Sequence, residues 1–76
     1  MKEADLLKLE AQRDSAAARM QQAREDLTAL DAAWPDHPEV AIVEAKQWLE
    51  RMAEAWAGVR DWAAQAIRGD AERELL

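Results

Sequence analysis

Apolar residues recur in the first half of the chain at alternating intervals of three and four. Such spacing places side chains on one stripe of an α-helix and is typical of a helix that packs along its length against another. It predicts a helix over about residues 3–33, with Arg13 as the one charged member of the stripe. The stripe consists of Leu6, Leu9, Arg13, Ala16, Met20, Ala23, Leu27, Leu30 and Trp34.

A similar pattern in the second half predicts a helix over about residues 37–68. Gly58 lies inside this helix, where glycine costs roughly 1 kcal/mol relative to alanine. Gly69 is expected to end it, leaving residues 69–76 as a C-terminal tail. No segment alternates apolar and polar residues as a strand does. The second stripe consists of Ile42, Ala45, Leu49, Met52, Trp56, Val59, Ala63 and Ala66.

The segment between the two patterns, residues 34–38, reads Trp-Pro-Asp-His-Pro and predicts a turn. Pro35 disfavours a helical backbone at Trp34. Asp36 and Glu39 have the spacing of a capping box, in which each side chain accepts a backbone N–H from the first turn of the new helix. The second helix is therefore expected to start directly after this turn.

Two helices of similar length joined by a short turn predict an all-α fold. We expect an antiparallel two-helix hairpin that forms one domain over residues 1–76. When one helix is folded onto the other, small residues face large ones almost throughout, as close packing requires. The facing pairs are Leu30 with Ile42, Leu27 with Ala45, Ala23 with Leu49, Met20 with Met52, Ala16 with Trp56, Arg13 with Val59, Leu9 with Ala63, and Leu6 with Ala66.

Three of the four tryptophans lie in the second predicted helix, in a chain without phenylalanine or tyrosine. Trp48 and Trp62 are two heptads apart and share a stripe with Ala41 and Ala55, beside the predicted seam. Apolar patches on small domains mark interfaces, and tryptophan is enriched at interface hot spots. We expect this stripe to bind a second copy, giving a four-helix bundle, or a helix of another protein. The alternative is that the indoles lie over the hairpin itself, with side chains such as Arg19 against their faces.

Arg13 has two interpretations that the sequence leaves open. Its stem can pack in the seam while the guanidinium reaches water. Alternatively, it can pair across a dimer with Asp61 or Glu54 and fix the register of the interface. We therefore count Arg13 among the expected interface residues.

The composition argues against several kinds of site. Without cysteine there is no disulfide, thiolate nucleophile or cysteine metal site. His37 is the only histidine and lies in the predicted turn, where turn chemistry is favoured over acid–base or metal chemistry. Ser15 and Thr28 have no base at helical spacing, and neither a glycine-rich phosphate loop nor a Glu-x-x-His metal pattern is found. We expect a protein that is not an enzyme and that binds no metal, cofactor or small-molecule substrate.

The acidity of the chain is spread along its length. Its 76 residues carry a net charge of −6, with five positive and seven negative side chains in residues 1–33 and five and nine in residues 34–76. Without a basic patch, direct nucleic-acid binding is not expected. No apolar run is long enough for a membrane span or a secretory signal, so a cytoplasmic protein is expected.

These observations lead to two main functional hypotheses. The first is a non-catalytic helical protein–protein interaction module, an adaptor, small chaperone or assembly subunit, that uses the tryptophan-rich face of the second helix. The second is a small acidic inhibitor, for example phage-encoded, that blocks a basic nucleic-acid-binding site on another protein. A metal- or cofactor-binding bundle is a third and weaker alternative.

Overall fold

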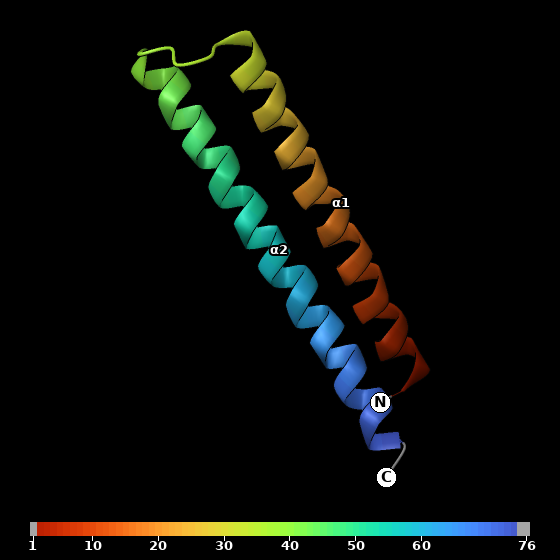
Figure 1. Cartoon of the computed structure of the whole chain (residues 1–76). Helices are drawn as coiled ribbons and strands as arrows, with labels where there is room; N and C mark the ends of the chain where they lie inside the picture. The colour runs from red at the N-terminus through yellow and green to blue at the C-terminus, as the bar shows by residue number, and fades with distance from the viewer. Residues whose placement is uncertain (1, 75–76) are drawn as a thin grey trace.

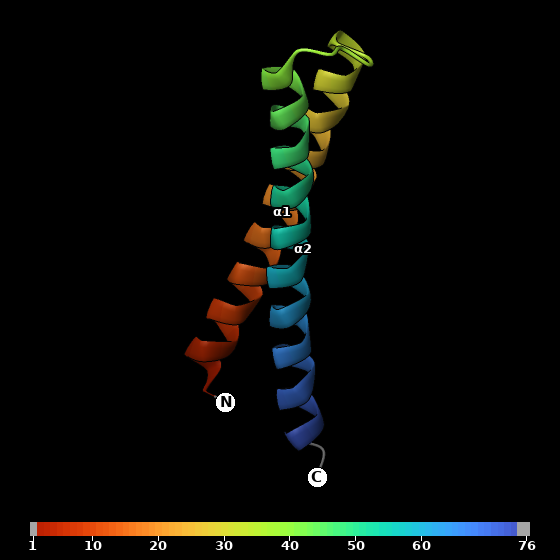
Figure 2. The same cartoon turned by 90° about the vertical axis from the view of Figure 1, so that its left-hand side faces the viewer.

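The computed structural model describes residues 2–74 and confirms the all-helical hairpin. Its two helices are α1 (Glu3–Ala33) and α2 (Val40–Glu74). They lie side by side and antiparallel, in a rod of 56 × 16 × 15 Å with both chain ends at the same end of the molecule (Figure 1). In the view of Figure 2 the two helices cross, and the N-terminal part of α1 diverges from α2.

Helix α1 has the predicted bounds. Glu3 and Asp5 lie in its first turn, where carboxylates favour the positive end of the helix dipole. The helix ends at Ala33 because Pro35 disfavours helical backbone at the residue before it. The N–H of Trp34 still donates to the carbonyl of Leu30 at 2.9 Å, which closes the last turn.

The turn differs from the predicted capping box. The N–H of Glu39 donates to Nδ1 of His37 at 3.1 Å, so the histidine side chain accepts this bond. Asp36 has a positive φ of 52°, a left-handed conformation that aspartate tolerates better than most residues. Because residues 34–39 form the turn, α2 begins at Val40, three residues later than predicted.

Helix α2 also ends later than predicted. Gly58 and Gly69 both lie inside it, and the helix continues to Glu74. The predicted stop at Gly69 is therefore wrong. Asp70, directly after this glycine, is only 8% exposed, so the rest of the molecule covers the helix here despite the poor helix propensity of glycine.

The residues of the predicted α1 seam are buried or half-buried over most of its length. Ala16, Met20 and Ala23 are buried, and the other members from Leu6 to Leu30 are half-buried. Trp34 is 48% exposed and lies past the end of the helix. Its ring meets the His37 ring edge to face, with the centroids 5.2 Å apart.

The seam on α2 differs from the prediction at every second position. The residues that face α1 are all buried or half-buried, and we call them the inner seam: Ile42, Lys46, Leu49, Ala53, Trp56, Arg60, Ala63, Ile67 and Asp70. Ala45 and Val59 were expected in the hairpin core but are exposed. Met52 and Ala66 are half-buried at its edge.

Two long cationic side chains explain this difference. Lys46 Nζ lies 2.9 Å from Oδ1 of Asp31 and donates to the carbonyl oxygen of Trp34 at 2.7 Å. Arg60 Nη1 lies 3.2 Å from the sulfur of Met20. Both residues cover α1 with their aliphatic stems while the charged ends reach hydrogen-bond acceptors. A sequence pattern built on apolar residues therefore does not identify them as seam residues.

The hairpin core is thin. Its buried hydrophobic residues, within the part of the chain that the structure describes, are Ala16, Met20, Ala23, Ala53 and Ala63. Met20, Ala23 and Ala53 form one cluster, against which Met52, Trp56 and Ala57 pack. Ala23 thus packs with Ala53, one helical turn beyond its predicted partner Leu49. Four of the five buried hydrophobic residues are alanines, so hairpin packing alone removes little apolar area from water.

The substitution Gly58→Ala should raise the free energy of unfolding of the single, unassociated hairpin by about 1 kcal/mol. The backbone there is helical, and an added Cβ meets no atom within 4 Å. Urea denaturation at one protein concentration measures the change, and Gly69→Ala offers a second site with the same open space. An unchanged or lower midpoint for both variants would show that the glycines relieve a constraint outside the hairpin.

Ala16→Leu should lower the free energy of unfolding by about 1–3 kcal/mol through overpacking. Ala16 is 1% exposed and lines one hollow together with Trp56. The matched control is Ala18→Leu, at an exposed position of the same helix, where a change within about 0.5 kcal/mol is expected. Equal melting temperatures for the two variants would contradict the packing of α1 on α2.

Candidate functional site

Helix α2 carries a second apolar seam beside the inner seam. Each of its members directly precedes a residue of the inner seam, so the two stripes are rotated by about 100° around the helix. We call this stripe the outer seam: Ala41, Ala45, Trp48, Met52, Ala55, Val59, Trp62 and Ala66. Its members are spaced by alternating steps of four and three, which is the spacing of a coiled-coil interface.

The outer seam is largely open to solvent. Trp48 is 60% exposed, Trp62 57% and Val59 37%. Ala41, Ala45 and Ala55 are exposed as well, while Met52 and Ala66 are half-buried. No charged or polar residue interrupts the outer seam, whereas Lys46, Arg60 and Asp70 interrupt the inner one. The more apolar of the two stripes therefore lies away from α1.

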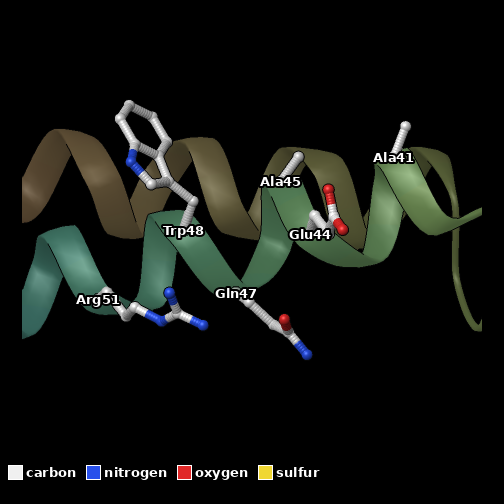
Figure 3. A pocket seen from close by; sticks show the side chains of 6 residues that line it. All are labelled: Ala41, Glu44, Ala45, Gln47, Trp48 and Arg51. Carbon is white, nitrogen blue, oxygen red and sulfur yellow. The ribbon is translucent and has the colours of Figure 1, made fainter.

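One end of the outer seam borders a shallow hollow on α2. Figure 3 shows the side chains of Ala41, Ala45 and Trp48 projecting from the same edge of the helix, and those of Gln47 and Arg51 from the opposite edge. An apolar row with polar side chains along its border is the arrangement found at protein interfaces, where a polar rim surrounds an apolar centre.

The tryptophans of the outer seam each line a hollow between the two helices. Trp62 lines one hollow with Val59 and Trp56, and Trp48 lines the other with Met52 and Trp56. Arg19 of α1 lines both hollows, with its guanidinium carbon 4.9 Å from the centre of the Trp56 ring. Arg19 thus packs on an indole, but on that of Trp56. The alternative expected this contact at Trp48 or Trp62, and both of these stay exposed.

The charged side chains that line the three hollows along the outer seam balance. The charged residues that line its three hollows are Arg19, Arg51, Asp26 and Glu44. Two positive and two negative side chains give this surface no net charge, although the whole chain carries −6. The excess acidity therefore lies on the rest of the molecule.

Four of the predicted interface residues share this surface, namely Trp48, Trp62, Ala41 and Ala55. Arg13 does not. It lies half-buried on α1, and its Nε is 3.0 Å from Oδ1 of Asp14. Asp61, one of its expected partners across a dimer, instead contacts Arg60 of its own chain at 2.9 Å.

The sequence prediction missed half of the outer seam. Ala45, Met52, Val59 and Ala66 were assigned to the hairpin core, although Ala45 and Val59 are exposed. The signal that identifies them is the offset of one residue between two overlapping heptad patterns on the same helix. Helix α1 covers only one of these two patterns.

Within residues 2–74, no group of three or more histidine and acidic side chains is arranged to hold a metal ion. Neither helix, over the same residues, has an apolar stretch long enough to cross a lipid bilayer. Comparisons of the chain with known protein families, curated proteins and solved structures gave no match.

Arg19→Gln should lower the free energy of unfolding by about 0.5–1 kcal/mol, because it removes the cation from the face of Trp56. Glutamine has nearly the same helix propensity as arginine, so the helix itself is unaffected. Arg24→Gln, at an exposed position of the same helix, is the matched control and should change stability less. Indistinguishable urea midpoints for the two variants would contradict a contribution of this contact.

Proposed function

We propose that this protein is a non-catalytic helical interaction module that docks a partner helix along the outer seam of α2. The observation that carries the proposal is a row of eight apolar residues, uninterrupted by charge, in which two tryptophans remain 60% and 57% exposed. Exposed apolar patches with a polar border mark interaction surfaces on small domains.

The spacing of the tryptophans supports an extended, helical partner. Trp48 and Trp62 are 14 residues apart on one helix, which corresponds to about 21 Å along its axis. A partner helix that lies parallel to α2 meets both indoles, and heptad spacing lets its side chains fit between them. Such a surface suits an adaptor, a small chaperone or an assembly subunit.

Two side chains that could act chemically, those of His37 and Thr28, are engaged in structural bonds, which supports a non-catalytic role. Nδ1 of His37 accepts the N–H of Glu39. The hydroxyl of Thr28 donates to the carbonyl oxygen of Arg24 at 2.9 Å, within the same helix. Neither group is paired with a base or nucleophile in the way that a catalytic dyad requires.

A second candidate function rests on the acidic remainder of the surface. An acidic protein can occupy a basic nucleic-acid-binding site on another protein, and the net charge of −6 lies outside the outer seam. The two functions differ in the force that holds the partner. Apolar docking persists at high salt, whereas attraction between exposed charges is screened.

Capture from a lysate of the source cell tests the proposal. The immobilised full chain should retain a partner, either free copies of this chain or another protein, at both low and high salt, and Trp48→Ala should abolish the retention. Leu7→Ala is the matched control, because Leu7 is 58% exposed but lies on α1, and it should retain the partner. Circular dichroism checks that both variants remain helical.

Two outcomes would contradict the docking function. A partner lost at high salt and unaffected by Trp48→Ala would favour the acidic inhibitor. Equal loss of the partner with Trp48→Ala and Leu7→Ala, both being helical, would show that the outer seam has no special role.

A further inference from the structure

We propose that the occupant of the outer seam is a second copy of this chain, packed antiparallel with α2 against α2. This inference rests on the proposed function and names the partner. When the α2 helix of a second copy runs in the opposite direction, the large residues of one outer seam face small residues of the other.

One antiparallel register pairs all eight residues of the outer seam. Trp48 then lies opposite Val59 of the second copy, and Met52 opposite Ala55 of the second copy. Trp62 meets Ala45 of the second copy, and Ala41 meets Ala66 of the second copy. Both tryptophans thus face smaller residues, as close packing between helices requires. The two-fold axis passes between Met52 and Ala55. Because of this symmetry, each of the four facing pairs occurs twice in the dimer.

Other arrangements of the same two helices pack less well. A shift by one heptad in one direction places Trp48 opposite Met52 and leaves Trp62 without a facing residue. The opposite shift places Met52 against Trp62 and leaves Ala41 and Ala45 unpaired. A parallel dimer sets each tryptophan against its own copy and each alanine against alanine, which gives collisions in some layers and voids in others.

The border of the outer seam is compatible with this register. Arg51 lies beside Gly58 of the second copy, and the missing side chain there leaves room for the guanidinium. An added Cβ at Gly58 meets no atom within 4 Å in the hairpin, so packing within one chain does not account for the glycine. Because the hollows around the seam carry balanced charges, two copies approach on the surfaces where their acidic charges repel least.

The exposed indoles supply a large share of the area that a dimer needs to bury. A tryptophan side chain offers up to about 250 Å², and at 60% and 57% exposure each indole has about 140 Å² left to bury. The four indoles of a dimer therefore supply about 550 Å², close to half of the roughly 1,200 Å² at the lower limit of stable interfaces. The remainder has to come from Val59, Met52, the alanines and the polar border along about 37 Å of helix.

The thin hairpin core also favours a second copy over an occasional partner. Only one buried hydrophobic residue among residues 2–73, Met20, is larger than alanine. Domains of this size commonly need a further source of stability, such as association. A second copy is present whenever the chain is present, so it can cover the outer seam at all times.

Sedimentation equilibrium gives the first test. The wild-type chain should be a dimer at micromolar concentration, with a melting temperature that rises with protein concentration. Trp62→Ala should raise the dissociation constant at least about 25-fold. Val40→Ala, which removes a 64% exposed residue outside the outer seam, should leave the dissociation constant unchanged. A wild-type chain that stays monomeric and fully helical at high micromolar concentration would overturn the inference.

Cross-linking tests the direction and the register without removing a tryptophan. The chain has no cysteine, so the single variants Ala41→Cys and Ala66→Cys each carry one thiol. Treated with a short bis-maleimide, a mixture of the two variants should form covalent dimers. A dimer of either variant alone should not be cross-linked. Its two thiols, one on each copy, lie about 37 Å apart in the proposed dimer.

The remaining outcomes are distinguishable. Efficient cross-linking of each variant with itself would indicate a parallel dimer and overturn the proposed arrangement. No cross-linking in any sample, together with a monomeric wild type, would exclude a second copy as the occupant. The docking function would then still be decided by capture of a different protein that depends on Trp48.

Discussion

The structure depends on a geometrical constraint of helix α2, which carries two apolar stripes one residue apart and has a single neighbouring helix. Helix α1 can cover only one of the stripes. It covers the inner seam, where Trp56, Leu49 and the stem of Lys46 form a broad surface. The outer seam is left exposed as a consequence of this choice. The hairpin and the exposure of the outer seam are therefore two results of the same packing of α1 on α2.

The charged residues of the inner seam help to determine which stripe faces α1. Lys46 joins α2 to the end of α1 through Asp31 and through the carbonyl of Trp34. This carbonyl lies beyond the last helical turn, where no backbone N–H of α1 is available to it. Lys46 on α2 therefore supplies a hydrogen-bond donor to a backbone carbonyl at the end of α1. Rotating α2 to bury the outer seam would break both contacts.

The sequence was sufficient to predict the hairpin, the bounds of α1 and the exposure of Trp48 and Trp62, because heptad spacing and the proline turn are local signals. The choice of stripe on α2 could not be predicted in the same way. The predicted seam and the inner seam share Ile42, Leu49, Trp56 and Ala63 and differ in the positions between them. Counting apolar residues favours Ala45 and Val59 over Lys46 and Arg60, since such a count ignores the aliphatic stems of long cations. The end of α2 was missed because burial of Asp70 is a tertiary effect.

The alanine-rich core reverses the usual sensitivity of a protein interior to substitution. In most cores, trimming a large side chain leaves a cavity and is the commonest route to instability. Here Ala16, Ala23, Ala53 and Ala63 have almost nothing to trim, and each is at most 7% exposed. Added methyl groups are the larger hazard, since they push the helices apart along their whole length. This interior therefore limits the size of its side chains more strictly than their hydrophobicity, and variation should keep the buried positions small.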